Sequence, residues 1–165
     1  YDMVMDGKVD DVKSASPWSY NNKFASLEAL AQGDGFGYIP QLVGYATAAG
    51  LGVGGWWVVN KANGEFKYVD ASGVDTGEVL ENIEATVSHI NEDKPFERCF
   101  EAIPETHYRK ATGNLKLGSE CGFCSFKHKC WPNLQTLPAV KSNAQNPPMV
   151  DYVLVQPEYL EAEVG

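Results

Sequence analysis

Two acidic residues and a lysine near the start of the chain have the types and spacing of a metal-dependent catalytic site. Asp6-Gly7 lies between two short runs of alternating polar and apolar residues, a pattern typical of a two-residue hairpin turn. If the residues that flank this turn pair with each other, Asp2 lies directly opposite Asp11, and Lys13 shares their face. Opposed carboxylates destabilise a sheet unless a cation binds between them. The pattern therefore predicts a divalent metal ion on this hairpin, and the other interpretation is a polar hairpin whose two aspartates face water.

The run Gly7–Ser16 (GKVDDVKSAS) resembles the catalytic strand of the PD-(D/E)XK nuclease superfamily, in its RecB-like and Cas4-like exonuclease branch. In that family the first acid and the acid of the (D/E)xK triplet bind Mg²⁺ or Mn²⁺, and the lysine works beside the attacking water. The resemblance implies that Asp2 and Asp11 are metal ligands, that the backbone carbonyl of Val12 is a third, and that Lys13 is catalytic. It also implies an α/β fold with a restriction-endonuclease-like core, in which helices flank a central mixed sheet.

Hydrolysis of a phosphodiester requires residues of these types. A carboxylate-bound divalent ion lowers the pKa of a bound water and stabilises the negative charge that develops on the phosphoryl oxygens. The lysine could act on the water or offset the developing charge, and the sequence leaves both roles open.

A second pair of polar residues lies on the helix expected over residues 39–49. Gln41 and Tyr45 are four residues apart, so they project from one face of that helix. Alone, the pair is typical of a helix-surface glutamine and a half-buried tyrosine. After a DxK strand it resembles the helical motif beside the metal site of RecB-type nucleases, which implies contacts with DNA phosphates or the active site. Ser14 could contact a phosphate or, like Ser16, cap the next helix.

Three cysteines, Cys121, Cys124 and Cys130, fall within ten positions, and thiolates at this spacing commonly converge on one metal centre. The cluster resembles the C-terminal part of the iron–sulfur site of Cas4-like nucleases, where three late cysteines and one distant cysteine hold a 4Fe–4S cluster. Cys99 is the one other cysteine and the candidate fourth ligand. A Zn²⁺ site and free thiols remain alternatives. In that family the distant cysteine precedes the nuclease motifs. Because the sequence enters the catalytic strand at Tyr1, we expect an N-terminally truncated nuclease.

Hydrophobic periodicity and turn residues predict an α/β domain. Strands are expected over residues 1–5, 8–13, 54–60 and 65–70, and helices over 19–32, 39–49 and 79–91. The apolar run around Trp56 and Trp57 is typical of a strand covered on both faces. We expect residues 1–133 to form the nuclease core with its cysteine cluster (99–130), and residues 134–165 to form a loop-rich tail with a short edge strand at 152–156.

The net charge of −9 for 165 residues argues against binding to nucleic acid, because nonspecific DNA-binding proteins usually present a basic surface. The segment 105–130 is an exception, with five Lys or Arg residues against two acids. No apolar run is long enough to span a membrane, and nothing indicates secretion. We therefore expect a cytoplasmic protein, of a bacterium or of a phage-infected host.

The expected function is a divalent-metal-dependent DNA exonuclease that acts on ends or single strands in phage or bacterial recombination and repair. The resemblance also implies a helicase or recombination partner. Two alternatives remain. One is a non-catalytic DNA-binding module stabilised by a cysteine metal site, and the other is an acidic protein-interaction domain.

Overall fold

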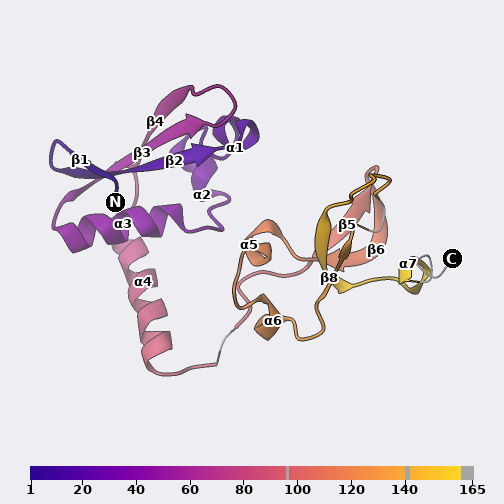
Figure 1. Cartoon of the computed structure of the whole chain (residues 1–165). Coiled ribbons are helices and arrows are strands. Elements are labelled where there is room, and N and C mark those ends of the chain that lie inside the picture. The colour runs from indigo at the N-terminus through magenta and orange to yellow at the C-terminus, as the bar shows by residue number, and fades with distance from the viewer. Residues whose placement is uncertain (96, 140–141, 161–165) are drawn as a thin grey trace. The chain divides into compact units, whose positions relative to one another are not determined.

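The computed structural model describes residues 1–95, 97–139 and 142–160, without the side chains of residues 158 and 160. The chain forms two compact units, Tyr1–Lys94 and Pro95–Gly165 (Figure 1). This division differs from the boundary after residue 133 that composition led us to expect. The strand Met149–Leu154 pairs with the strand Lys110–Lys116, and local composition does not reveal pairing between segments so far apart in the chain.

The first unit combines a four-stranded sheet with four helices. The strands are β1 (Met3–Met5), β2 (Lys8–Ala15), β3 (Gly52–Asn60) and β4 (Phe66–Asp70), and the helices are α1 (Pro17–Asn21), α2 (Leu27–Ala31), α3 (Tyr38–Ala49) and α4 (Thr76–Asn91). The strand order is β1-β2-β3-β4; β2 and β3 are parallel, and the other neighbours are antiparallel. An α/β fold with a mixed sheet, as expected from the sequence, is confirmed.

The β1–β2 hairpin has the predicted two-residue turn. Asp6 (φ 49°) and Gly7 (φ 73°) both have positive φ, as a type I′ turn requires. The strands pair in the expected register, with Met3 opposite Asp10. This register sets which side chains of β2 share a face.

The helix expected over residues 19–32 is instead two short helices. Ser16 caps α1 by accepting a hydrogen bond from the Ser19 amide at 3.2 Å, and Ser26 caps α2 by accepting one from the Ala29 amide at 3.2 Å. Because Ser26 is extended (φ −159°), it ends any continuous helix and starts a new one. The helix expected over residues 39–49 is confirmed as α3, which ends at Gly50 in the left-handed region (φ 67°).

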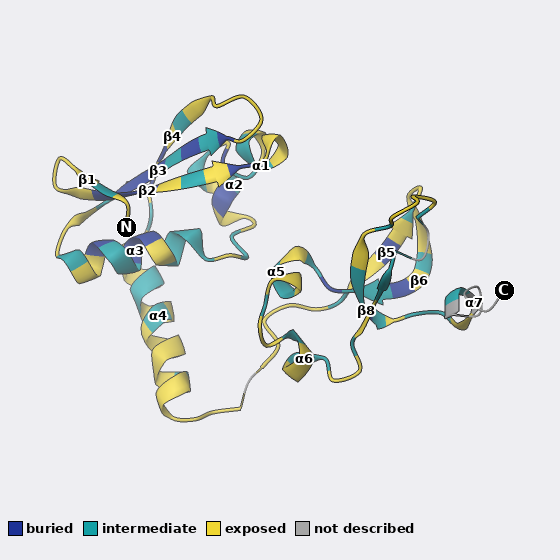
Figure 2. Ribbon diagram, viewed as in Figure 1, coloured by how far each residue is buried: buried dark blue, intermediate teal, exposed yellow. Residues whose placement is uncertain are grey.

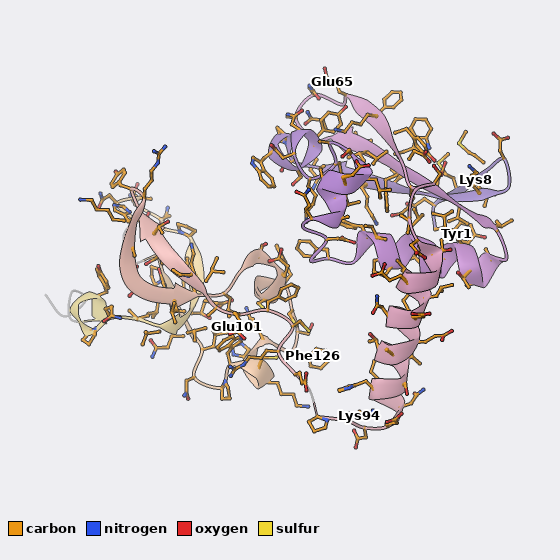
Figure 3. The ribbon with its side chains drawn as sticks, turned by 180° about the vertical axis from the view of Figure 1, so that it is seen from behind. Tyr1, Lys8, Glu65, Lys94, Glu101 and Phe126 are labelled. Atoms are coloured by element: carbon orange, nitrogen blue, oxygen red, sulfur yellow. The ribbon has the colours of Figure 1, made fainter. Side chains whose placement is uncertain are left out.

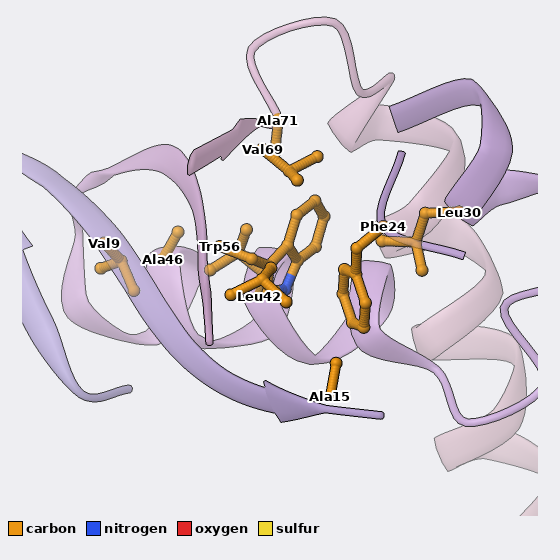
Figure 4. Packing of buried hydrophobic residues seen from close by; sticks show 10 residues of the cluster. Val9, Ala15, Phe24, Leu30, Leu42, Ala46, Trp56, Val69 and Ala71 are labelled. Carbon is orange, nitrogen blue, oxygen red and sulfur yellow. The ribbon is translucent and has the colours of Figure 1, made fainter. Parts of the chain in front are cut away.

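The core of this unit lies on one face of the sheet. Trp56 is fully buried, and Figure 4 shows its ring among side chains from the helices and the neighbouring strand. The buried cluster consists of Val9, Ala15, Phe24, Leu30, Leu42, Ala46, Trp56, Val58, Val69 and Ala71. Trp57 points to the opposite face because side chains alternate along a strand, and its neighbours Phe66 and Tyr68 are 68% and 40% exposed. The expectation that this strand is covered on both faces was therefore wrong.

Helix α4 begins at an Asp75 cap, whose carboxylate accepts hydrogen bonds from the Gly77 and Glu78 amides at 3.0 and 3.1 Å. Its first turns are partly buried, whereas Val87 and Ile90 in the later turns are exposed (Figure 2). No helix within the described residues is long and apolar enough to cross a membrane.

The second unit is built on an antiparallel sheet in the order β5-β6-β8-β7. Its elements are β5 (Ile103–His107), β6 (Lys110–Lys116), α5 (Ser119–Gly122), α6 (Lys127–Cys130), β7 (Gln135–Pro138), β8 (Met149–Leu154) and α7 (Pro157–Leu160). The expectation of an edge strand over residues 152–156 was wrong, because the strand there, β8, ends at Leu154 and pairs with both β6 and β7 in the interior of the sheet. The described residues after 133 thus contribute two strands, β7 and β8, to the sheet.

A buried polar network joins three of these strands. The Glu105 carboxylate accepts hydrogen bonds from the Tyr152 hydroxyl at 2.6 Å, the Asn114 amide at 2.7 Å and the Thr112 hydroxyl at 3.0 Å. The side-chain oxygen of Asn114 in turn accepts a hydrogen bond from the backbone N–H of Gln156 at 2.9 Å. Burial by itself would raise the pKa of Glu105, but these hydrogen bonds outweigh it and hold that pKa below its usual value. The network therefore secures β8 inside the sheet.

Candidate active site

The hairpin register brings the carboxyl groups of Asp2 and Asp11 into contact. Asp2 accepts a hydrogen bond from the Val12 amide at 2.7 Å, and this bond, followed by one with Asp11, lowers the pKa of Asp2. Asp11 is 4% exposed, and burial is the main cause that raises its pKa. The pKa values of the two carboxyl groups are thus pushed in opposite directions, and a cation bound between them would offset the repulsion of two charged carboxylates.

Lys13 connects this acid pair to helix α3. Its ammonium nitrogen lies 2.5 Å from Asp11 Oδ2 and donates a hydrogen bond to Gln41 Oε1 at 2.8 Å. Asp11 Oδ2 is buried and, despite this close ion pair, accepts no hydrogen bond of acceptable geometry. The ion pair holds the two charges in direct contact whatever the donor angle. The oxygen nevertheless retains an unused lone pair, which a cation could occupy.

The donor set suits a hard divalent cation, because carboxylate and backbone carbonyl oxygens are the ligands that Mg²⁺ prefers. Asp2, Asp11 and the carbonyl of Val12 are the residues that could hold it. Among the described residues, no group of three or more His, Cys, Asp or Glu side chains is arranged to hold a metal ion. An ion on this acid pair would therefore complete its coordination with water or substrate oxygens, as Mg²⁺ commonly does.

The other residues predicted for the site are only partly assembled around it. Gln41 is in place through its hydrogen bond with Lys13. Tyr45, one turn further along α3, packs against the hydrophobic core, with its ring edge-on to Tyr1 at 6.3 Å. Ser14 is exposed and follows Lys13 in the strand, so its side chain points to the opposite face of the sheet. The structure therefore brings Gln41, and not Ser14, to the acid pair (Figure 3 shows the side chains of this unit).

Asp10 is a buried carboxylate that sequence reasoning overlooked. It is 3% exposed and accepts hydrogen bonds from the Gly55 amide at 2.9 Å, the Tyr68 hydroxyl at 3.0 Å and the Trp57 indole at 3.2 Å. Burial, together with Asp10, raises the pKa of Tyr68 to about 12. Since the Asp10 oxygens are occupied by protein donors, this residue has a structural role, in contrast to Asp11 beside it.

A bulge in β3 makes room for the Asp10 carboxylate. The β2–β3 register shifts between Val9 and Asp11, where β3 has one extra residue. A Cβ atom at Gly54 would lie only 1.9 Å from Asp10 Oδ1, so this position requires glycine. The adjacent Asp-Asp and Gly-Gly pairs were the sequence signal, but their contact depends on the register of two strands far apart in the chain.

In the second unit, the four cysteines lie in one neighbourhood. Burial raises the pKa of Cys121 most, and the nearby Cys124, Cys130 and Cys99 add to the effect. Cys124 Sγ also accepts a hydrogen bond from the Phe126 amide at 3.4 Å. All four are free thiols, and their sulfur chemistry suits Zn²⁺ or an iron–sulfur cluster, although they do not converge as a metal-holding group.

Contacts of Arg98 tie the segment that carries Cys99 to the end of the segment with the other three cysteines. The Arg98 guanidinium stacks on the Trp131 ring at 3.9 Å and donates a hydrogen bond to the Cys130 carbonyl at 3.0 Å. Both partners lie at the end of the cysteine cluster, so the segment that carries Cys99 is held against it.

Comparisons of this chain with protein-family models, curated proteins and solved structures gave no match.

Proposed function

We propose that this chain is a divalent-metal-dependent DNA exonuclease of the PD-(D/E)XK superfamily, in the RecB-like and Cas4-like branch, with a restriction-endonuclease-like core in its first unit. The observation that carries the proposal is the contact between Asp2 and Asp11, with Lys13 2.5 Å from Asp11 Oδ2. Two carboxylates and a lysine on one face of a hairpin, backed by a helix, match the chemistry of phosphodiester hydrolysis.

Each residue has a role that follows from its position. Asp2 and Asp11 would hold Mg²⁺ or Mn²⁺, which supplies Lewis acidity and lowers the pKa of a bound water. Lys13, beside Asp11, is placed to orient the attacking water or to offset charge on the phosphoryl oxygens. Gln41 accepts a hydrogen bond from Lys13 and so fixes the direction of the ammonium group. Tyr45 would contact the DNA strand from the next turn of the same helix.

The acidic net charge is compatible with this function. A bound divalent ion would neutralise the Asp2–Asp11 pair and present positive charge to a phosphate. Lys13 adds a second positive charge at the same place. Attraction of DNA would therefore depend on the metal more than on the average charge of the surface.

The cysteines of the second unit would hold a 4Fe–4S cluster, with Zn²⁺ as the alternative occupant. Their loop contains only the short helices α5 and α6, so a metal would stabilise a segment with little secondary structure. We further propose single-stranded DNA or DNA ends as the substrate, a helicase or recombination protein as a partner, and a bacterial or host cytoplasm as the location.

The test is degradation of end-labelled single- and double-stranded DNA in Mg²⁺ or Mn²⁺. The wild-type chain should release labelled nucleotides, and both Asp11→Asn and Lys13→Ala should slow this by at least about 10²-fold. Lys61→Ala is the matched control, because Lys61 is exposed in the turn after β3. Full activity of Asp11→Asn would refute the assignment.

A non-catalytic DNA-binding module is the second candidate, because Lys13 already neutralises Asp11 without a metal. This alternative predicts that DNA stays intact in every reaction although the protein binds it. An acidic interaction protein would bind no DNA at any salt concentration.

A further inference from the structure

A second lysine, Lys23, faces the same aromatic ring as the candidate catalytic lysine. The ammonium nitrogen of Lys13 lies 5.2 Å from the centre of the Tyr38 ring, and that of Lys23 lies 5.6 Å from it. Lys23 also lies 5.0 Å from the centre of the Phe36 ring. These are cation–π distances, so the two aromatic rings hold the Lys23 ammonium beside the candidate active site.

The elements that carry these residues are anchored in the core. Phe24, next to Lys23, is 3% exposed, and its ring packs against Tyr38 at 5.4 Å. The Asp34 carboxylate accepts hydrogen bonds from the Tyr38 and Ile39 amides, both at 2.8 Å, which fixes the first turn of α3. The position of Lys23 is therefore set by buried packing on one side and by a capped helix on the other.

The two lysines differ in how their charge is compensated. Lys13 is paired with Asp11 at 2.5 Å. Within the described part of the chain, no carboxylate lies within ion-pair distance of Lys23, and its contacts are the two aromatic rings. The Asp34 carboxylate is already engaged at the start of α3. Lys23 thus presents an uncompensated positive charge against the same ring as Lys13, which pairs with Asp11.

We infer that Lys23 is a positioning residue that binds a DNA phosphate adjacent to the scissile one. The inference rests on the proposed nuclease function. The two ammonium groups share the Tyr38 ring, so they are at most about 11 Å apart, and one strand carries a phosphate every 3.4 Å or so along the helix axis. Lys13 and Lys23 can therefore face nearby phosphates of the same strand.

The experiment measures binding of a fluorescent single-stranded oligonucleotide by anisotropy, with Mg²⁺ at a fixed concentration and a phosphorothioate backbone that resists hydrolysis, so that the DNA is bound but not cut. A plot of the logarithm of the DNA association constant against the logarithm of salt concentration has a negative slope. Removing one phosphate contact should make this slope less steep by about 0.7. For Lys23→Gln, the loss of affinity between about 50 and 200 mM salt should thus be about 2.6-fold smaller than for the wild type. Lys61→Gln, which removes an equal charge from an exposed turn, should keep the wild-type slope.

Variants of Tyr38 separate a binding effect from a folding effect. Tyr38→Phe keeps the ring and should keep the wild-type salt dependence. Tyr38→Leu removes the shared ring and should make the slope less steep. Thermal melting checks that both variants are folded. The inference is overturned if Lys23→Gln keeps the wild-type slope, or if Lys61→Gln reduces the steepness of the slope as much as Lys23→Gln does. It is also overturned if the wild-type chain binds no DNA.

The two proposals fail separately in these experiments. If the Lys23→Gln slope falls but the wild type never cuts DNA in Mg²⁺ or Mn²⁺, the phosphate contact stands and the nuclease function fails. If the wild type cuts DNA and the slope is unchanged, the nuclease function stands and the role of Lys23 fails.

Discussion

Replacement of Asp10 by asparagine should destabilise the first unit strongly, although it replaces only one heavy atom. The carboxylate is 3% exposed and accepts from Gly55, Tyr68 and Trp57. In Asp10→Asn the amide oxygen can still accept from Gly55 and Tyr68, but the amide NH₂ group then faces the Trp57 indole N–H, so two donors meet. Loss of one hydrogen bond to a charged group costs about 1.5–3 kcal/mol, and a buried unpaired donor costs about 1–3 kcal/mol. We therefore expect the free energy of unfolding to fall by about 3 kcal/mol.

The neighbouring change Asp11→Asn is the matched comparison. Burial raises the pKa of Asp11, so at neutral pH the folded state carries a charge that it disfavours. Asparagine removes this charge, while Lys13 keeps its hydrogen bond to Gln41. Asp11→Asn should therefore leave the free energy of unfolding unchanged or raise it, while it abolishes the activity proposed above.

Urea unfolding followed by tryptophan fluorescence measures both effects. In a Trp131→Phe background, the three remaining tryptophans all lie in the first unit, so the signal reports on that unit alone. The reasoning is refuted if Asp10→Asn stays within about 1 kcal/mol of the parent, well below the expected cost, or if Asp11→Asn is the more destabilised of the two.

Three further predictions concern the bulge, the second sheet and the cysteines. Gly54→Ala places a Cβ atom 1.9 Å from Asp10 Oδ1 and should lower the free energy of unfolding of the first unit by about 3 kcal/mol, measured by the same fluorescence assay. The pKa of Glu105 is lowered on folding, so its stabilising contribution is present above the unfolded-state pKa of about 4.3 and is lost as the pH falls through the lower folded-state pKa. Thermal melts at decreasing pH should show this loss in the wild type, and Glu105→Gln should flatten that part of the profile. Cys124→Ser should reduce the iron or zinc content of anaerobically purified protein, measured by elemental analysis, and Cys99→Ser should do the same if Cys99 is a ligand. An unchanged metal content in Cys124→Ser would contradict the proposed centre.

Local sequence signals were sufficient to predict the hairpin and the helix behind it. The Asp6-Gly7 turn determines the register of β1 and β2, and this register places Asp2 beside Asp11. Helix α3 was predictable because it has a continuous apolar pattern and ends at Gly50. These features depend on residues close together in the chain.

Features that depend on distant segments could not be predicted. The role of Asp10 requires the bulge at Gly54, which arises only when β2 and β3 pair. Strand β8 follows a segment rich in Pro, Asn and Ser, and its place in the sheet depends on Tyr152 reaching Glu105. The position of Lys23 near Lys13 depends on the packing of the segment after α1 against α3, through Phe24 and Tyr38.

Calorimetric titration with Mn²⁺ tests most directly whether the acid pair is a metal site. The full chain should bind Mn²⁺, and both Asp2→Ala and Asp11→Asn should abolish that binding heat. Ser14→Ala, on the opposite face of the same strand, should bind as the wild type does. Binding that survives in both Asp2→Ala and Asp11→Asn would contradict the assignment of this hairpin as the metal site.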